Sequence, residues 1–170
     1  MPDSRAVVRD NQDNIIAAGY LTNNGSGRDF YVVKLNSTTG GVAWSYSPSA
    51  SSSCPYAPLT EWDQAEAVAV VTSDGSNDII AAGYTTTSGV SNFAVVRLSS
   101  AVGSCGRPTE RWRKTPFVGL GGGTTFVGAE EATGVAVDAS GNVVAVGHTL
   151  DSCARVSTSM SLLVARLNLE

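Results

Sequence analysis

The sequence predicts an all-β fold built from three repeats of about 64 residues, which together form a single repeat domain over residues 1–170. One short apolar segment occurs three times: Ile15–Thr22, Ile79–Thr85 and Val143–Thr149. The glycines of these segments are evenly spaced, 64 residues apart: Gly19, Gly83 and Gly147. A fixed period of this length marks a repeat architecture. Charged residues make up only 15% of the chain, and no amphipathic helical period is present, so we expect almost no helix.

The first strand of each repeat is expected directly before a polar turn. These strands are Arg5–Arg9, Ala67–Val71 and Gly134–Asp138. The turns that follow are rich in Asn, Asp and Gly, at residues 10–14, 73–78 and 138–142. These residue types supply the positive φ angles and local side-chain bonds that hairpin turns need. Each repeat is therefore predicted to begin with a β-hairpin.

The second and third strands follow in the same order in every repeat. The second strand is the segment that carries the glycine, and its β-branched residues and alanines indicate burial on both faces. The third strands end in Lys or Arg followed by Leu, as strand alternation requires: Phe30–Leu35, Phe93–Leu98 and Leu162–Leu167.

The fourth strand of a repeat carries a tryptophan, and the sequence contains two such strands. These strands are Val42–Tyr46, with Trp44, and Glu110–Lys114, with Trp112. The Ser/Pro-rich stretch 47–59 and the Gly-rich stretch 119–128 are predicted surface loops. The third repeat reaches Glu170 before its fourth strand. The expected repeats are about 5–62, 63–128 and 129–170.

Four antiparallel strands with a structural tryptophan are typical of a β-propeller blade. Residues 138–149, Asp-Ala-Ser-Gly-Asn-Val-Val-Ala-Val-Gly-His-Thr, resemble the core of the bacterial β-propeller repeats called SBBP repeats. Residues 34–44 resemble the tryptophan-docking segment of quinoprotein-like blades. The resemblance implies about 2.75 blades that act as scaffold, in a bacterial protein that is secreted or lies on the cell surface.

Fewer than three blades are too few to close a propeller, which has four to eight. Three solutions remain open: a piece of a longer propeller, a homo-oligomer with itself, or a different threefold fold such as a β-trefoil or β-prism. An open flank of apolar strands promotes aggregation, so a lone open array is the least favoured state. The expected partners are the chain itself or the rest of a longer propeller, and also a glycan or a protein.

The charge and the cysteines exclude or leave open several classes of function. The net charge of −4 argues against nucleic-acid binding, and no apolar run approaches the length of a membrane span. The three cysteines, Cys54, Cys105 and Cys153, lack the spacing of a metal site. Whether any two of them form a disulfide stays open.

Several polar groups are candidates for chemistry, but each has a structural explanation. The oxygens of two turns are candidate calcium ligands: Asp10, Asp13 and Asn14, and Asp74, Asn77 and Asp78. The only histidine, His148, replaces Tyr20 and Tyr84 at the same repeat position. Glu130 and Glu131 are adjacent carboxylates; since neighbours on a strand point to opposite faces, they are expected to belong to a turn or an edge rather than to an acid/base pair. We therefore expect no catalytic residue, no metal and no cofactor.

The aromatic residues give the one candidate ligand surface. Trp44 and Trp112 recur with the repeat and are expected to pack between blades, whereas Trp62 has no counterpart. Tyr46, Tyr56 and Trp62 are predicted to form a binding surface near the Ser/Pro-rich loop. The expected function is a non-enzymatic scaffold or binding module. The alternatives are a lectin-like carbohydrate-binding module and a fragment of a larger propeller enzyme.

Overall fold

The computed structural model describes residues 2–23, 27–48, 63–103, 106–115, 129–151 and 159–167. These ranges contain antiparallel strands and turns and no α-helix, as the missing helical period predicts. Within them, no helix is long and apolar enough to cross a membrane. The prediction of an all-β fold is confirmed.

The described strands form three antiparallel sheets, each with its strands paired in chain order. Sheet 1 contains β1 (Pro2–Arg9), β2 (Ile15–Asn23), β3 (Gly27–Leu35) and β4 (Val42–Tyr46). Sheet 2 contains β5 (Gln64–Val70), β6 (Ile79–Thr87), β7 (Val90–Val102) and β8 (Pro108–Lys114). Sheet 3 contains β9 (Glu130–Val137), β10 (Val143–Asp151) and β11 (Ser159–Leu167). The expected repeat boundaries fall in 49–62 and 116–128, outside the described residues, and stay a prediction.

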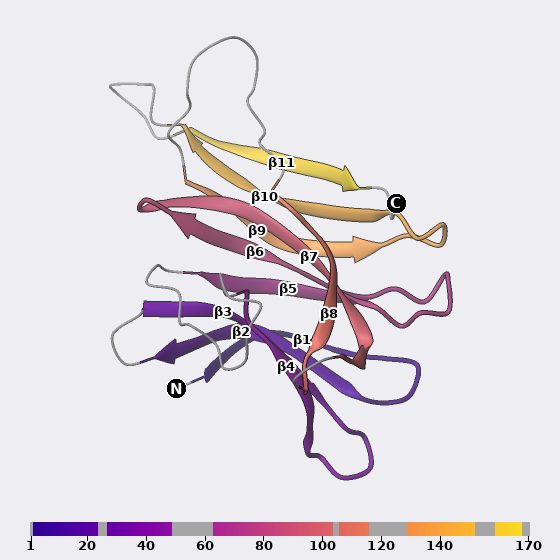
Figure 1. The fold of residues 1–170 in the computed structure, drawn as a ribbon. Coiled ribbons are helices and arrows are strands. Elements are labelled where there is room, and N and C mark those ends of the chain that lie inside the picture. Colours follow the sequence, from indigo (N-terminus) through magenta and orange to yellow (C-terminus); the bar gives the residue numbers. More distant parts are fainter. Residues whose placement is uncertain are drawn as a thin grey trace.

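The three sheets lie on one another as successive layers, with sheet 2 in the middle (Figure 1). Strand β5 of sheet 2 contacts β1, β2 and β3 of sheet 1. Strand β9 of sheet 3 makes the equivalent contacts with β5, β6 and β7 of sheet 2. Each sheet thus meets the next in the same way. We call the face that points toward the next sheet the forward face, and the opposite one the rear face.

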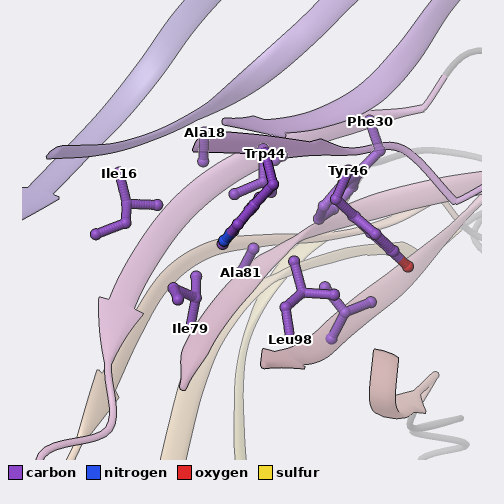
Figure 2. Close-up of a cluster of buried hydrophobic side chains, with 11 residues drawn as sticks. Ile16, Ala18, Phe30, Trp44, Tyr46, Ile79, Ala81 and Leu98 are labelled. Carbon is purple, nitrogen blue, oxygen red and sulfur yellow. The ribbon is translucent and has the colours of Figure 1, made fainter. Parts of the chain in front are cut away.

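The layer between sheets 1 and 2 is a continuous apolar core (Figure 2). Sheet 1 contributes its forward face: Ile16, Ala18, Phe30, Val32, Trp44 and Tyr46. Sheet 2 contributes Ala65 and four residues of its rear face that are at most 1% exposed: Ile79, Ala81, Val96 and Leu98. Each fully buried large side chain contributes about 1.5–3 kcal/mol to stability. Alternation along the strands directs these side chains into one layer.

The layer between sheets 2 and 3 repeats this core almost residue for residue. The forward face of sheet 2 presents Ile80, Ala82, Phe93 and Val95, which match Ile16, Ala18, Phe30 and Val32 of sheet 1. They pack against Ala132, Val143 and Ala145 of sheet 3. Since the same side chains recur at the same register, one packing solution is used twice.

The repeated glycine of each second strand lies opposite a β-bulge in the first strand. The register shifts between Ser4 and Ala6 in β1, between Ala65 and Ala67 in β5, and between Ala132 and Gly134 in β9. A Cβ added to Gly83 would overlap the carbonyl oxygen of Gln64, and Gly19 and Gly147 are crowded in the same way. The recurring glycine is therefore required by the close approach of two backbones.

Two details differ from the sequence expectations. The first strands begin earlier than predicted: Gln64 lies in β5, and Glu130 and Glu131 lie in β9, because pairing continues beyond the bulge. Burial of the second strand on both faces holds for β6 but not for β2, where Ile15 is 37% exposed. This difference arises because no described element covers the rear face of sheet 1.

Candidate functional site

A polar joint connects sheets 1 and 2 at the rim of their apolar layer. The Nζ of Lys34 donates to Oγ of Ser100 at 2.7 Å and to its carbonyl oxygen at 3.4 Å. The Nε1 of Trp44 donates to the same carbonyl oxygen at 3.1 Å. One backbone carbonyl of β7 thus accepts bonds from two side chains of sheet 1, which fixes how the two sheets align.

The same lysine neutralises a buried carboxylate in the first hairpin turn. Lys34 Nζ lies 2.8 Å from Oδ2 of Asp10, and both side chains are almost completely buried. Burial raises the pKa of Asp10, but hydrogen bonds from Lys34, from Asn14 and from the amides of Gln12 and Asn14 outweigh it and hold the pKa below its usual value. Asp10 is therefore a charged structural group of the turn.

In sheet 2, an arginine neutralises the carboxylates of the equivalent turn. Arg97 pairs with Asp78 through Nε and with Asp74 through Nη2, both at 2.8 Å. Hydrogen bonds from Ser76, followed by Arg97, lower the pKa of Asp74 to about 2. The candidate calcium ligands Asp10, Asp74 and Asp78 are thus already paired with cations of the protein. In the described part of the chain, no group of three His, Cys, Asp or Glu side chains is arranged to hold a metal ion.

A second polar group lies where the first strand of each sheet pairs with the end of the second strand. We call it the polar end. Three equivalent cross-strand pairs form it: Asp3 opposite Tyr20, Gln64 opposite Tyr84, and Glu131 opposite His148. The bulges add one further side chain in each sheet: Arg5, Glu66 and Thr133. The polar end thus runs across all three sheets.

Arginines cover the aromatic ring of Tyr20. The guanidinium carbons of Arg28 and Arg5 lie 4.4 Å and 5.7 Å from the ring centroid. The Tyr20 hydroxyl donates to Asp3 at 2.8 Å, and this bond is the main reason that the pKa of Tyr20 is raised. The ring already has cation–π partners, which leaves less of it for stacking on a sugar.

Arg28 also connects the polar end to the next sheet. Its Nη1 donates to Oε1 of Gln64 at 3.0 Å. Burial raises the pKa of Tyr84, the nearby carboxylate of Glu131 adds to this, and Arg28 opposes it. Glu131 in turn lies 3.8 Å from Nε2 of His148. These contacts link the three cross-strand pairs into one charged surface.

The predicted ligand-surface residues do not come together as a described site. Tyr46 is 6% exposed in the core between sheets 1 and 2, where its hydroxyl donates to Glu110 and accepts from Arg113 at 3.1 Å. Burial raises the pKa of this hydroxyl well above its usual value. Tyr56 and Trp62 lie outside the described residues, as do Cys54, Cys105 and Cys153. The placement of Tyr46 gives it a packing role.

The recurring tryptophans both lie at sheet interfaces. Trp44 is buried between sheets 1 and 2, and Trp112 packs against the core between sheets 2 and 3. Unlike Trp44, Trp112 has no hydrogen-bond partner for Nε1 among the described residues. The two residues therefore share a packing role but differ in their polar contacts.

Two stretches of the chain, residues 12–40 and 72–104, match the family model described as "Domain of unknown function (DUF5122) beta-propeller". Both stretches begin in the turn before the second strand and run past the third, so they cover equivalent parts of sheets 1 and 2. The chain carries β-propeller repeats. No curated protein matches it. The finer resemblance to SBBP or quinoprotein-like blades and the number of propeller blades stay predictions.

Sequence reasoning missed the polar end of the propeller sheets. It placed Tyr20, Tyr84 and His148 in one repeat position but did not identify their partners. The signal was present in the acidic or amide residue before each first strand, at Gln64 and Glu131. Simple strand alternation does not predict their partners, because a β-bulge shifts these residues by one position.

Proposed function

We propose that this chain is a non-enzymatic β-propeller module whose polar end binds a protein partner. One observation carries the proposal: equivalent positions hold the same residues in the core and different residues at the polar end. Ile16 and Phe30 recur as Ile80 and Phe93. The bulge position, in contrast, holds Arg5, Glu66 and then Thr133. A scaffold keeps its packing residues and varies the positions that contact a ligand.

Charge distribution supports a polar partner rather than a stacked sugar. The cations Arg5 and Arg28 lie on sheet 1 together with Asp3, whereas Glu66, Glu130 and Glu131 lie on sheets 2 and 3. Complementary charges on a partner protein would fix its orientation across the three sheets. Stacking on a sugar is disfavoured at Tyr20, whose ring arginines cover, and at Tyr46, which is buried in the core between sheets 1 and 2. The expected extracellular or cell-surface location in a bacterium belongs to the same proposal.

The test uses a peptide array and a glycan array probed with the labelled chain. We expect binding to charged peptides that weakens at least about tenfold in Arg5→Ala and in Glu66→Gln. The matched control is Arg9→Ala, since Arg9 lies on the same strand β1 at the opposite end and is exposed. Binding to glycans that all three variants retain would contradict the proposal, as would equal weakening by Arg9→Ala.

A further inference from the structure

The rear face of sheet 1 is an apolar surface that no described element covers. Its apolar residues come from all four strands of the sheet: Val7, Ile15, Ala17, Val33, Leu35 and Val42. Arg9 lies on the same face, at the edge strand β1. Val7 is 69% exposed and Val42 is 65% exposed. A contiguous apolar face of this kind marks an interaction surface.

The equivalent face of sheet 2 shows what such a surface is built to contact. Ile79, Ala81, Val96 and Leu98 hold the register positions of Ile15, Ala17, Val33 and Leu35. All four are at most 1% exposed, because the forward face of sheet 1 packs on them. The rear face of sheet 1 therefore has the residues of an interior face, and the surface that fits it is a forward face.

The forward face of sheet 3 is the matching surface. Val144 and Val146 hold the register positions of Ile16 and Ala18 and are half-buried. Arg166 pairs opposite Val144, as Lys34 pairs opposite Ile16 and Arg97 opposite Ile80. Sheet 3 thus keeps the register pattern of the two forward faces that are packed within the chain.

We propose that the forward face of sheet 3 docks on the rear face of sheet 1 of a second copy, and that two copies close head to tail. The occupant is a second copy because each chain carries a rear face and a three-stranded forward face that keep the register of the faces already packed on each other within the chain. A contact between two different faces closes into a ring when the rotation allows it. Two copies supply six sheets, which lies within the range of closed propellers.

The backbone carbonyl of Ser37 is the hydrogen-bond acceptor of this docking surface. The amide of Ser37 donates to Oδ1 of Asn14 at 3.0 Å, just as the amide of Ser100 donates to Oδ1 of Asp78 at 3.3 Å. Ser100 is the residue whose carbonyl accepts from Lys34 and Trp44 of the preceding sheet. The carbonyl of Ser37 occupies the same place on the outermost sheet, where a cation from a second copy completes it.

The experiment measures the mass of the chain in solution by sedimentation equilibrium. We expect the wild type at twice its mass of 17.5 kDa. Val7→Glu, on sheet 1, and Val144→Glu, on sheet 3, should each weaken association at least about 100-fold and give monomers, because each change removes apolar contact and places a carboxylate in the interface. Val42→Glu provides a second test of the sheet 1 face. The matched control Val102→Glu should remain a dimer, since Val102 is an exposed valine at the end of β7, away from both faces.

Circular dichroism of each variant shows whether it keeps its strands, and only folded variants are compared. A wild-type chain that stays at 17.5 kDa at about 100 μM would overturn the proposal and indicate a sheet from a longer protein as the occupant. A dimer that Val7→Glu breaks and Val144→Glu keeps would overturn the head-to-tail arrangement in favour of two sheet 1 faces in contact. Open polymers would overturn the closed ring. None of these outcomes depends on the polar end.

Discussion

Trp44 and Ser100 are joined across the interface of two sheets: the indole Nε1 of Trp44 donates to the carbonyl oxygen of Ser100 at 3.1 Å. The two residues are far apart in sequence, and Lys34 donates to the same carbonyl. This joint combines apolar packing with a directional bond, so it fixes the alignment of the sheets as well as their separation.

Trp44→Phe should destabilise the chain more than Trp112→Phe does. Both changes remove an indole from a sheet interface, but only Trp44 loses a hydrogen bond to a described partner. We expect an additional loss of about 1 kcal/mol in the free energy of unfolding. Urea denaturation of the two single variants checks this. Equal losses would show that the bond to Ser100 adds nothing to stability.

Lys34→Met should lower the free energy of unfolding by about 3 kcal/mol, because it leaves the buried carboxylate of Asp10 without its cation. The control is Lys114→Met, since Lys114 is exposed at the end of β8. This variant should change the free energy of unfolding by no more than about 0.5 kcal/mol. Thermal and urea denaturation of both variants give the comparison. If the two variants were equally stable, the Lys34–Asp10 pair would have no structural role.

Gly83→Ala should destabilise the chain by at least about 3 kcal/mol, since the new Cβ overlaps the carbonyl oxygen of Gln64. Gly41→Ala is the control, because its Cβ would meet only the side chain of Thr39, at 3.3 Å. A change below about 1 kcal/mol in Gly83→Ala would mean that the bulge in β5 relaxes, and it would contradict the close approach of β5 and β6.

The stability of the chain should fall in acid in part through Asp74. Its pKa of about 2 lies below the value of about 3.9 for an unfolded aspartate. A lowered folded-state pKa contributes stability above the unfolded value, and this contribution disappears as the pH falls toward 2. The free energy of unfolding of Asp74→Asn should therefore approach that of the wild type between pH 4 and 2. Curves that stay parallel over this range would contradict the lowered pKa that the hydrogen bonds from Ser76, followed by Arg97, give Asp74.

The repeat and its strands could be predicted because they depend on local patterns. The even spacing of Gly19, Gly83 and Gly147 predicts the repeat, and the alternation of apolar and polar residues predicts the strands. Neither prediction needs knowledge of contacts between sheets. The reason for the glycine could not be predicted, since it lies in the carbonyl of a bulged neighbouring strand. The polar joint also escaped sequence reasoning, because Lys34 and Ser100 meet only when two sheets stack.

The ligand surface was the least predictable part. Aromatic residues near a Ser/Pro-rich loop predict a ligand surface that includes Tyr46, but this tyrosine faces the next sheet, and its hydroxyl is bonded to Glu110 and Arg113 of β8. Sequence alone gives the alternation of a strand, but it does not show which alternate face a second sheet covers. The same limitation applies to β2: no described element packs on its rear face, whereas the forward face of sheet 1 packs on the rear face of β6.

Complementation between two interface variants tests the central claim, the equivalence of the sheet faces, most directly. Val7→Glu labelled with ¹⁵N is mixed with unlabelled Val144→Glu, and the mixture is analysed by native mass spectrometry. Each variant keeps one intact face, so we predict a mixed dimer of one labelled and one unlabelled chain that neither variant forms alone. A mixture that contains only monomers, or only dimers of like chains, would contradict the account.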